Sequence, residues 1–256
     1  MNAKHDYIAV FDSGVGGISV LRHLLRRLPG ERFLYYGDSA NAPYGSRTTE
    51  EVRQLTLAAA EKLTKEYGIK ALVIACNTAT AAAVKHVREQ YPSLIVIGIE
   101  PALKVAADNF PGGRIGVMAT EVTLREEKFD LLLHRFDEEC TITKIPAPGL
   151  VQLIEAGKVD TEETEALLRQ ILKDHIGNLD ALVLGCTHYP FASKAISRVL
   201  GEQVRLLEGG DGTARETKRR LAEAGLLEEG AGEVRILNSA ANENMIRLSW
   251  QRLKDQ

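Results

Sequence analysis

The chain has 256 residues, of which 45% are hydrophobic and 26% are charged, a composition that is typical of a folded globular protein and excludes a largely disordered or fibrous one. A formal net charge of −3 provides no basic excess for binding a nucleic-acid backbone, and the apolar runs are far shorter than the roughly 20 residues that cross a bilayer. Three cysteines are too few for a disulfide framework and indicate free thiols in a reducing compartment. We therefore expect a cytoplasmic protein that binds neither nucleic acid nor membrane.

Short β-branched runs alternate along the chain with longer segments of helical period. This pattern is typical of parallel strands joined by crossover helices, so we expect the α/β class with mostly parallel sheets. Helices are expected to occupy most of the gaps between strands. The expected strands are Tyr7–Phe11, Arg32–Tyr36, Ala71–Ala75, Leu94–Gly98, Arg114–Met118, Thr141–Ile145, Ala181–Gly185, Val204–Leu207 and Val234–Leu237.

Capping patterns indicate where some of these helices begin. Thr48 is followed three residues later by Glu51, which is the pattern of a capping box. Asp160 and Glu163 have the same spacing, and Asp211 is expected to cap the helix that follows Gly212.

A strand that ends at a cysteine occurs twice in the chain. The segment Ala71–Thr78 is echoed by Ala181–His188, with Cys76 and Cys186 at the same place. Each cysteine is expected to close a buried strand and to open a helix, where the helix macrodipole favours the thiolate. The repetition indicates two related halves.

Two related halves predict two pseudosymmetric α/β domains with the active site in the cleft between them. The predicted first domain comprises residues 1–97 and 209–256 and contains Cys76, and the second comprises residues 98–208 and contains Cys186. Ligands of open α/β sheets gather at the carboxyl ends of the strands, which is where both thiols are expected.

The first strand runs into a glycine-rich segment, Asp12–Gly17, and then into an amphipathic helix. The glycines and Ser19 nearly match the dinucleotide-binding fingerprint, with Asp38 at a suitable distance for a ribose hydroxyl, but the third glycine is missing. A tight turn before a helix explains the glycines equally well. In a third interpretation, amides at this helix start and Ser13 bind a small carboxylate.

Other cysteine chemistries fit the sequence less well. Cys76, Cys186 and His188 could supply three ligands of a catalytic zinc ion, but their spacing matches no metal motif. A cysteine hydrolase with His188 as its base would leave Cys76 without a role. Cys140 lacks the strand–cysteine–helix context and is expected to be an inert, small hydrophobic residue.

Two facing thiols suit the inversion of a carbon centre. A single base tends to return a proton to the face it left, whereas two groups, one deprotonated and one protonated, can exchange roles across the carbon. Cysteine is suitable because its pKa lies near neutrality. Asp12 lies at the end of the first strand and His188 lies two residues after Cys186, so both are candidates for adjusting the protonation of the thiols.

A series of motifs then connects the sequence with a known family. The motifs cover both halves, from about Tyr7 to Thr213, and together they resemble the glutamate racemases of the aspartate/glutamate racemase superfamily. These cofactor-independent enzymes supply D-glutamate for bacterial peptidoglycan. The motifs are Phe11–Gly17, Tyr36–Asp38 with Pro43–Gly45, Ala75–Thr80 and Gly185–Pro190.

The resemblance implies a role for each reactive residue. Cys76 would act on the α-proton of D-glutamate and Cys186 on that of L-glutamate, each reprotonating the intermediate that the other forms. Asp12 would assist Cys76, while Glu155 and His188 would assist Cys186. The resemblance implies no cofactor and no metal, glutamate as the partner, and is compatible with a homodimer. The residues implied to hold the substrate are Asp12, Ser13, Tyr44, Gly45, Asn77, Thr78, Thr120, Thr123, Thr187 and His188.

The sequence departs from the family pattern in two stretches. The segment Leu124–Glu126 stands where a serine is more common, and Leu207–Gly210 lacks an aspartate that is common there. Neither stretch contains a thiol, so these departures concern domain closure or an interface more than the chemistry. From about Glu228 onward the resemblance is weak.

Several rival functions share this scaffold. Aspartate racemases, hydantoin racemases and related decarboxylases are the nearest enzymes, and the decarboxylases can keep only one of the two cysteines. A non-catalytic amino-acid-binding module is the alternative from a different class. The intact pair of cysteines, with Asp12 and His188 beside it, favours an active glutamate racemase.

Overall fold

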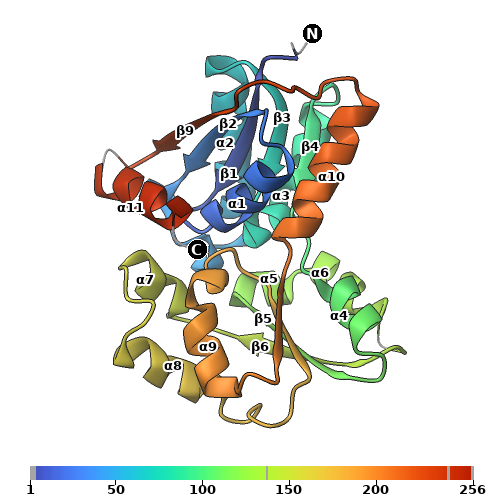
Figure 1. The fold of residues 1–256 in the computed structure, drawn as a ribbon, viewed down its shortest axis with the longest axis vertical. Helices are drawn as coiled ribbons and strands as arrows, with labels where there is room; N and C mark the ends of the chain where they lie inside the picture. Colours follow the sequence, from blue (N-terminus) through green and yellow to red (C-terminus); the bar gives the residue numbers. More distant parts are fainter. Residues whose placement is uncertain (1–3, 137, 241–242, 255–256) are drawn as a thin grey trace. The chain divides into compact units, whose positions relative to one another are not determined.

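The computed structural model describes residues 4–136, 138–240 and 243–254. The chain divides into two compact units: unit 1 contains the described residues up to Glu100 and from Gly210 onward, and unit 2 contains Pro101–Gly209 (Figure 1). Each unit has its own sheet, and every strand pair in both sheets is parallel. The prediction of an α/β fold with parallel sheets is therefore confirmed, and so is each expected strand, to within two residues at either end.

Unit 1 is built on a sheet with the strand order β4-β3-β1-β2-β9. Its central strand β1 is apolar at nearly every position because helices cover both of its faces. Ala9 and Phe11 pack in one cluster with α2 and α3, while α1 packs with α10 and α11. The elements of unit 1 are β1 (Tyr7–Asp12), α1 (Ile18–Arg27), β2 (Arg32–Gly37), the 3₁₀ helices η1 (Ser39–Asn41) and η2 (Tyr44–Ser46), α2 (Thr49–Glu66), β3 (Ile69–Ile74), α3 (Asn77–Gln90), β4 (Ile95–Gly98), α10 (Gly210–Glu223), β9 (Glu233–Asn238) and α11 (Glu243–Lys254).

Unit 2 is built on a sheet with the strand order β6-β5-β7-β8. One face of this sheet packs with α7, α8 and α9 around Met118 and Leu184, and the other packs with α4, α5 and α6 around Val117 and Val183. The alternation along β5 and β7 therefore divides the core into two layers. The elements of unit 2 are α4 (Leu103–Asn109), β5 (Arg114–Ala119), α5 (Glu121–Arg125), α6 (Glu127–His134), β6 (Thr141–Pro146), α7 (Leu150–Glu155), α8 (Glu162–Leu172), β7 (Ala181–Leu184), the 3₁₀ helix η3 (Tyr189–Ala192), α9 (Ser193–Leu200) and β8 (Arg205–Glu208).

The helix starts confirm one capping prediction and correct two. Thr48 and Glu51 form the predicted capping box of α2. Asp160 does not cap α8, because the next residue, Thr161, has the extended conformation of a cap and its hydroxyl accepts from the amide of Thr164 at 3.3 Å. Asp211 does not cap α10 either, since the helix already begins at Gly210 and places Asp211 inside its first turn.

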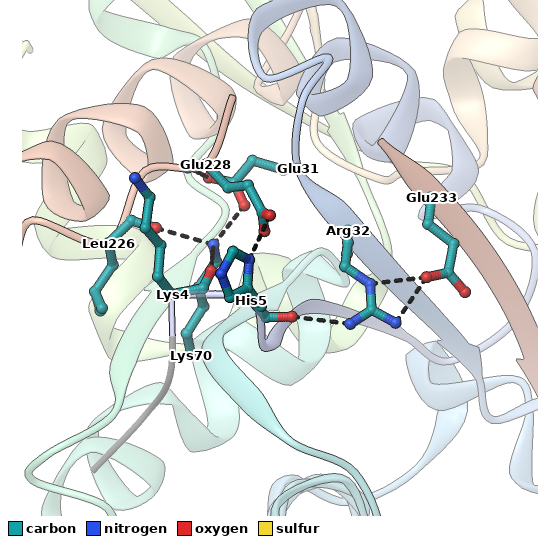
Figure 2. Close-up of polar contacts among 8 residues, drawn as sticks. All are labelled: Lys4, His5, Glu31, Arg32, Lys70, Leu226, Glu228 and Glu233. Atoms are coloured by element: carbon teal, nitrogen blue, oxygen red, sulfur yellow. Dashed lines mark hydrogen bonds and ion pairs between the residues drawn. The ribbon is translucent and has the colours of Figure 1, made fainter. Parts of the chain in front are cut away.

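A buried ion pair connects segments of unit 1 that are distant in the sequence. It lies near the amino ends of β2 and β3. Lys70 and Glu31 are both 0% exposed, and their Nζ and Oε2 atoms lie 2.5 Å apart. The ammonium group also donates to the carbonyl oxygens of Lys4 and Leu226, and the other oxygen of Glu31 accepts from the amide of Glu228 at 2.8 Å (Figure 2). The pair thereby joins the N-terminal segment and the segment before β9 to β2 and β3.

We expect Lys70→Met to lower the free energy of unfolding by about 3–5 kcal/mol, because it leaves the Glu31 carboxylate buried without its cation. Urea unfolding followed by circular dichroism measures the change. The matched control is Lys104→Met, which removes an exposed ion pair with Asp108 and is expected to cost about 0–1 kcal/mol. Equal losses in the two variants would contradict a stabilising role for the buried pair.

Candidate active site

The candidate residues of unit 1 lie where neighbouring parallel strands end. Asp12 is the last residue of β1 and Cys76 follows β3 by two residues. The two strand ends are joined by the hydrogen bond from the amide of Ala75 to the carbonyl of Phe11, at 2.8 Å. The thiol of Cys76 donates to Oγ of Ser13 at 3.6 Å, so the structure brings these predicted residues together.

Cys76 is the N-cap of α3, as the sequence predicts. Its Sγ accepts from the amide of Ala79 at 3.5 Å. A sulfur at this position lies at the positive end of the helix macrodipole, which favours its thiolate. Asn77 and Thr78 form the first turn of the same helix and are buried, and Oδ1 of Asn77 has no hydrogen-bond partner among the described residues. The start of α3 therefore combines a cysteine at the helix N-terminus with a buried side-chain acceptor that has no partner among the described residues.

The glycine-rich segment is a turn that holds Asp12 in place. The amide of Gly14 donates to Oδ1 of Asp12 at 3.0 Å, and the hydroxyl of Tyr35 donates to the carbonyl of Gly14 at 2.7 Å. A Cβ on Gly17, the N-cap of α1, would lie only 2.6 Å from Cβ of Asp12. This glycine is therefore required for the close approach of α1 to the end of β1.

Tyr44 and Gly45 lie in η2, near the same strand ends. The side chain of Tyr44 is buried, and its hydroxyl donates to Oδ2 of Asp38 at 2.6 Å. Burial, followed by the bond to the Asp38 carboxylate, raises the pKa of Tyr44 far above its ordinary value. Asp38 also accepts from the amide group of Asn41, so its carboxylate is occupied by internal donors. This arrangement does not favour the interpretation of Asp38 as a ribose ligand.

Polar contacts connect the candidate residues Cys186, His188 and Glu155 of unit 2. Sγ of Cys186 lies 3.7 Å from Nδ1 of His188, and Nε2 of His188 lies 2.9 Å from Oε1 of Glu155, at the end of α7. Burial lowers the pKa of His188, but its hydrogen bonds to Cys186 and Glu155 outweigh that effect and hold the pKa well above the ordinary value. A raised pKa favours the protonated form of His188, in which Nδ1 faces Cys186 and Nε2 faces Glu155.

Cys186 does not open an α-helix, in contrast to the prediction. Its carbonyl accepts from the amide of Tyr189 at 3.1 Å, and the short 3₁₀ helix η3 follows. A regular α-helix would need the amide of Pro190 as the next donor to this carbonyl, and proline has none. The imidazole ring of His188 thus lies beside Cys186, where a helix start lies beside Cys76.

Three threonines of the predicted substrate set lie in unit 2. Thr120 caps α5 by accepting from the amide of Thr123 at 3.3 Å, and the two hydroxyls are 2.9 Å apart. Thr187, which directly follows Cys186 in the sequence, is buried. The structure places Thr120 and Thr123 in one turn, at the end of β5.

Cys140 lies apart from these groups. It is buried in the apolar cluster around α6, and its thiol donates to the carbonyl of Phe136 at 3.6 Å. Over residues 4–136, 138–240 and 243–254, no group of three or more His, Cys, Asp or Glu side chains is arranged to hold a metal ion. In the same ranges, no helix has the length and apolar character of a membrane span.

The parallel α/β fold, with a buried cysteine and its polar partners at a strand end in each unit, is compatible with the amino-acid racemases. The model of the Asp/Glu/Hydantoin racemase family matches residues 9–217, and the chain belongs to this family. It is an amino-acid racemase.

Individual relatives are similar to the chain over its full length. The glutamate racemase of Clostridium acetobutylicum is 46% identical over 256 residues, with 99% of each chain covered, so the similarity continues beyond Glu228. The crystal structure of a glutamate racemase from Bacillus anthracis has a TM-score of 0.89 at 34% identity and covers 99% of this chain and 96% of its own. That of the Francisella tularensis glutamate racemase in complex with D-glutamate has a TM-score of 0.85 at 28% identity, with coverages of 99% and 95%.

We expect Glu155→Gln to move the alkaline limb of the pH profile of kcat/KM to lower pH by about one to two units, because the lost carboxylate no longer raises the pKa of His188. Initial rates between pH 6 and pH 10 measure the shift. Glu163→Gln, which removes an exposed carboxylate paired with Lys158, is the control and should leave the limb in place. An unmoved limb in Glu155→Gln would show that Glu155 does not control the protonation of His188.

We expect Gly17→Ala to lower kcat/KM by about tenfold or more, since the added methyl group displaces Asp12 from the end of β1. Gly212→Ala is the matched control, because a Cβ there meets no atom within 4 Å. Circular dichroism shows whether both variants are folded. Equal activity in the two variants would contradict the requirement for close approach at Gly17.

Proposed function

We propose that this racemase interconverts L-glutamate and D-glutamate without a cofactor, using Cys76 and Cys186 as its two bases. The observation that carries the proposal is the pair of buried thiols, each at the end of a parallel strand and each with its own means of stabilising a thiolate. Glutamate as the substrate is supported by the full-length similarity to proteins named glutamate racemase.

The proposed reaction moves one proton off the α-carbon and another onto it. From L-glutamate, the thiolate of Cys186 takes the α-proton, and the C–H electron pair remains on carbon as a carbanion. The thiol of Cys76 then gives its proton to the opposite face, which forms D-glutamate and leaves Cys76 as a thiolate. The reverse reaction exchanges these roles, as a two-base inversion requires.

The surroundings of each thiol fit this exchange. The imidazolium of His188, held by Glu155, stabilises the thiolate of Cys186 before proton removal. The start of α3 stabilises the thiolate of Cys76, and the buried carboxylate of Asp12 is the proposed partner that adjusts its protonation.

The remaining predicted residues would hold the substrate. The unused buried Oδ1 of Asn77 is a suitable acceptor for the ammonium group of an amino acid. Main-chain amides at the start of α3 and the hydroxyls of Ser13 and Thr187 would donate to its carboxylates, and fixed dipoles of this kind also stabilise a carbanion that no cofactor delocalises. We assign Thr120 and Thr123 to the same set of substrate contacts.

The product would supply peptidoglycan synthesis. D-Glutamate for the cell wall is the role that the resemblance implies, and the cytoplasm is the proposed place of action. All three cysteines are free in the structure, and a reducing compartment keeps thiols in this state.

The substrate is tested by following optical rotation with L-glutamate and with L-aspartate, using protein treated with a chelator and supplied with no cofactor. We expect L-glutamate to lose its rotation completely, and L-aspartate to keep it. Inversion of L-aspartate alone would move the chain to a sister activity within the family, and inversion only with added metal or pyridoxal phosphate would contradict cofactor independence.

We expect Cys76→Ser and Cys186→Ser each to lower the rate of racemisation by about a thousandfold or more, because a serine hydroxyl is a far weaker acid than a thiol and leaves one face without a competent group. Cys140→Ser is the matched control and should retain the rate of the unmodified enzyme. Polarimetry with both enantiomers measures all variants. Full turnover in either of the first two would refute the two-thiol mechanism.

A further inference from the structure

Asp38 is a buried carboxylate that the proposed chemistry does not use. It follows β2 directly, and only 4% of its surface is exposed. Its amide donates to the carbonyl of Asp12 at 2.9 Å, which ties it to the end of β1. Its side chain accepts from the hydroxyl of Tyr44 at 2.6 Å and from Nδ2 of Asn41 at 3.1 Å. Each carboxylate oxygen therefore has an internal donor.

The hydrogen bond to Asp38 limits which groups of Tyr44 can bind a ligand. The hydroxyl proton of Tyr44 is committed to Asp38, and the ring packs in the apolar cluster of unit 1, with its centroid 6.3 Å from that of Phe11. The hydroxyl has no second proton to donate, so the donors that this segment can offer to a substrate carboxylate are the main-chain amides of Tyr44 and of its neighbour Gly45. The position of that main chain depends on where the buried ring and hydroxyl are held.

A second set of bonds closes the same loop. Nε of Arg47 donates to the carbonyl of Asn41 at 2.8 Å, and the amide of Asn41 donates to the carbonyl of Asp38 at 3.0 Å. The whole segment from Asp38 to Arg47 is thus folded around one carboxylate. Because this carboxylate accepts from both Asn41 and Tyr44, removing it would leave both donors without their acceptor.

We propose that Asp38 is a positioning residue: it holds Tyr44, and through it the Tyr44–Gly45 main chain, in the place where that main chain binds the substrate. The inference rests on the proposed function, because the substrate contact of this segment is part of it. Asp38 exchanges no proton in the reaction. Its contribution is an acceptor in a fixed place, so an uncharged acceptor of the same shape should replace it.

The test compares Asp38→Ala, Asp38→Asn and Tyr44→Phe in the full-length enzyme, with Asp108→Asn as a control on an exposed carboxylate. We expect Asp38→Ala to raise KM for both enantiomers by about tenfold or more with a smaller change in kcat, because a substrate contact is lost and the thiols are intact. Asp38→Asn keeps an oxygen for the Tyr44 hydroxyl and should stay within about threefold of the unmodified enzyme. The pH limits of kcat/KM should be the same in all variants.

The double variant Asp38→Ala with Tyr44→Phe shows whether the two side chains act as a unit. We expect it to be no more impaired than Asp38→Ala alone, since residues that share one interaction have non-additive effects. An unchanged KM in Asp38→Ala, additive losses in the double variant, or an Asp38→Asn enzyme as impaired as Asp38→Ala would each overturn the inference. Where Asp38→Ala does not fold by circular dichroism, Tyr44→Phe decides: a raised KM supports the inference, and an unchanged KM overturns it.

Failure of the proposed function would look different. In that case the unmodified enzyme would not racemise glutamate at all, and no comparison of KM values would be needed. An active unmodified enzyme with an insensitive Asp38→Ala variant would instead leave the proposed function in place and remove only the role of Asp38.

Discussion

The pairing of β1 with β2 on one side and β3 on the other determines the chemistry of unit 1. In this register Asp12 lies beside Gly37, and Phe11 lies beside Ile74, so three strands end at the same level of the sheet. Carbonyl oxygens at the end of β1 accept from the amides that follow β2 and β3, which fixes the first residues beyond each strand. This ladder of hydrogen bonds brings Asp12, Asp38 and Cys76 to the same edge of the sheet. Gly17 then allows the close approach of α1 to Asp12, whose Oδ1 accepts from the amide of Gly14.

The thiolates of Cys76 and Cys186 are stabilised by different groups. Cys76 lies at the start of a regular α-helix, whose amides and macrodipole favour a negative charge on sulfur. Pro190 prevents a regular α-helix after Cys186, and the buried ring of His188, bonded to Glu155 and with a raised pKa, lies beside that sulfur instead. The helix start beside Cys76 is part of the backbone and does not titrate. The stabilisation of Cys186 depends on the protonation of His188. Loss of the His188 proton at alkaline pH should therefore weaken the stabilisation of the Cys186 thiolate and leave the helix start beside Cys76 unchanged.

The sequence predicts most of the strands and the cap at Cys76 because these features depend on residues that are adjacent in the sequence. Each strand is visible as a short apolar run, and the cap at Cys76 follows from an expected strand that ends at Ala75, directly before the cysteine. The turn after Cys186 was missed because one proline in the first turn changes the hydrogen-bond pattern. Neither the bond between Asp38 and Tyr44 nor the ion pair of Lys70 with Glu31 was predicted, since both join residues that only the folded loops and sheet bring together. Thr161 shows a further limit: two adjacent residues could each cap α8, and backbone conformation decided between them.

The central claim is that two different groups deliver protons to opposite faces of one carbon. It is tested most directly by the position of deuterium at early times, when each enantiomer of glutamate reacts separately in deuterium oxide and both enantiomers are recovered and analysed by mass spectrometry. A two-base enzyme delivers a solvent-derived deuteron from the second thiol, so the product should carry deuterium at the α-carbon while the recovered substrate stays protonated, in both directions. Deuterium that enters recovered substrate and product equally from the start, or product that retains the original proton, would contradict the two-thiol mechanism.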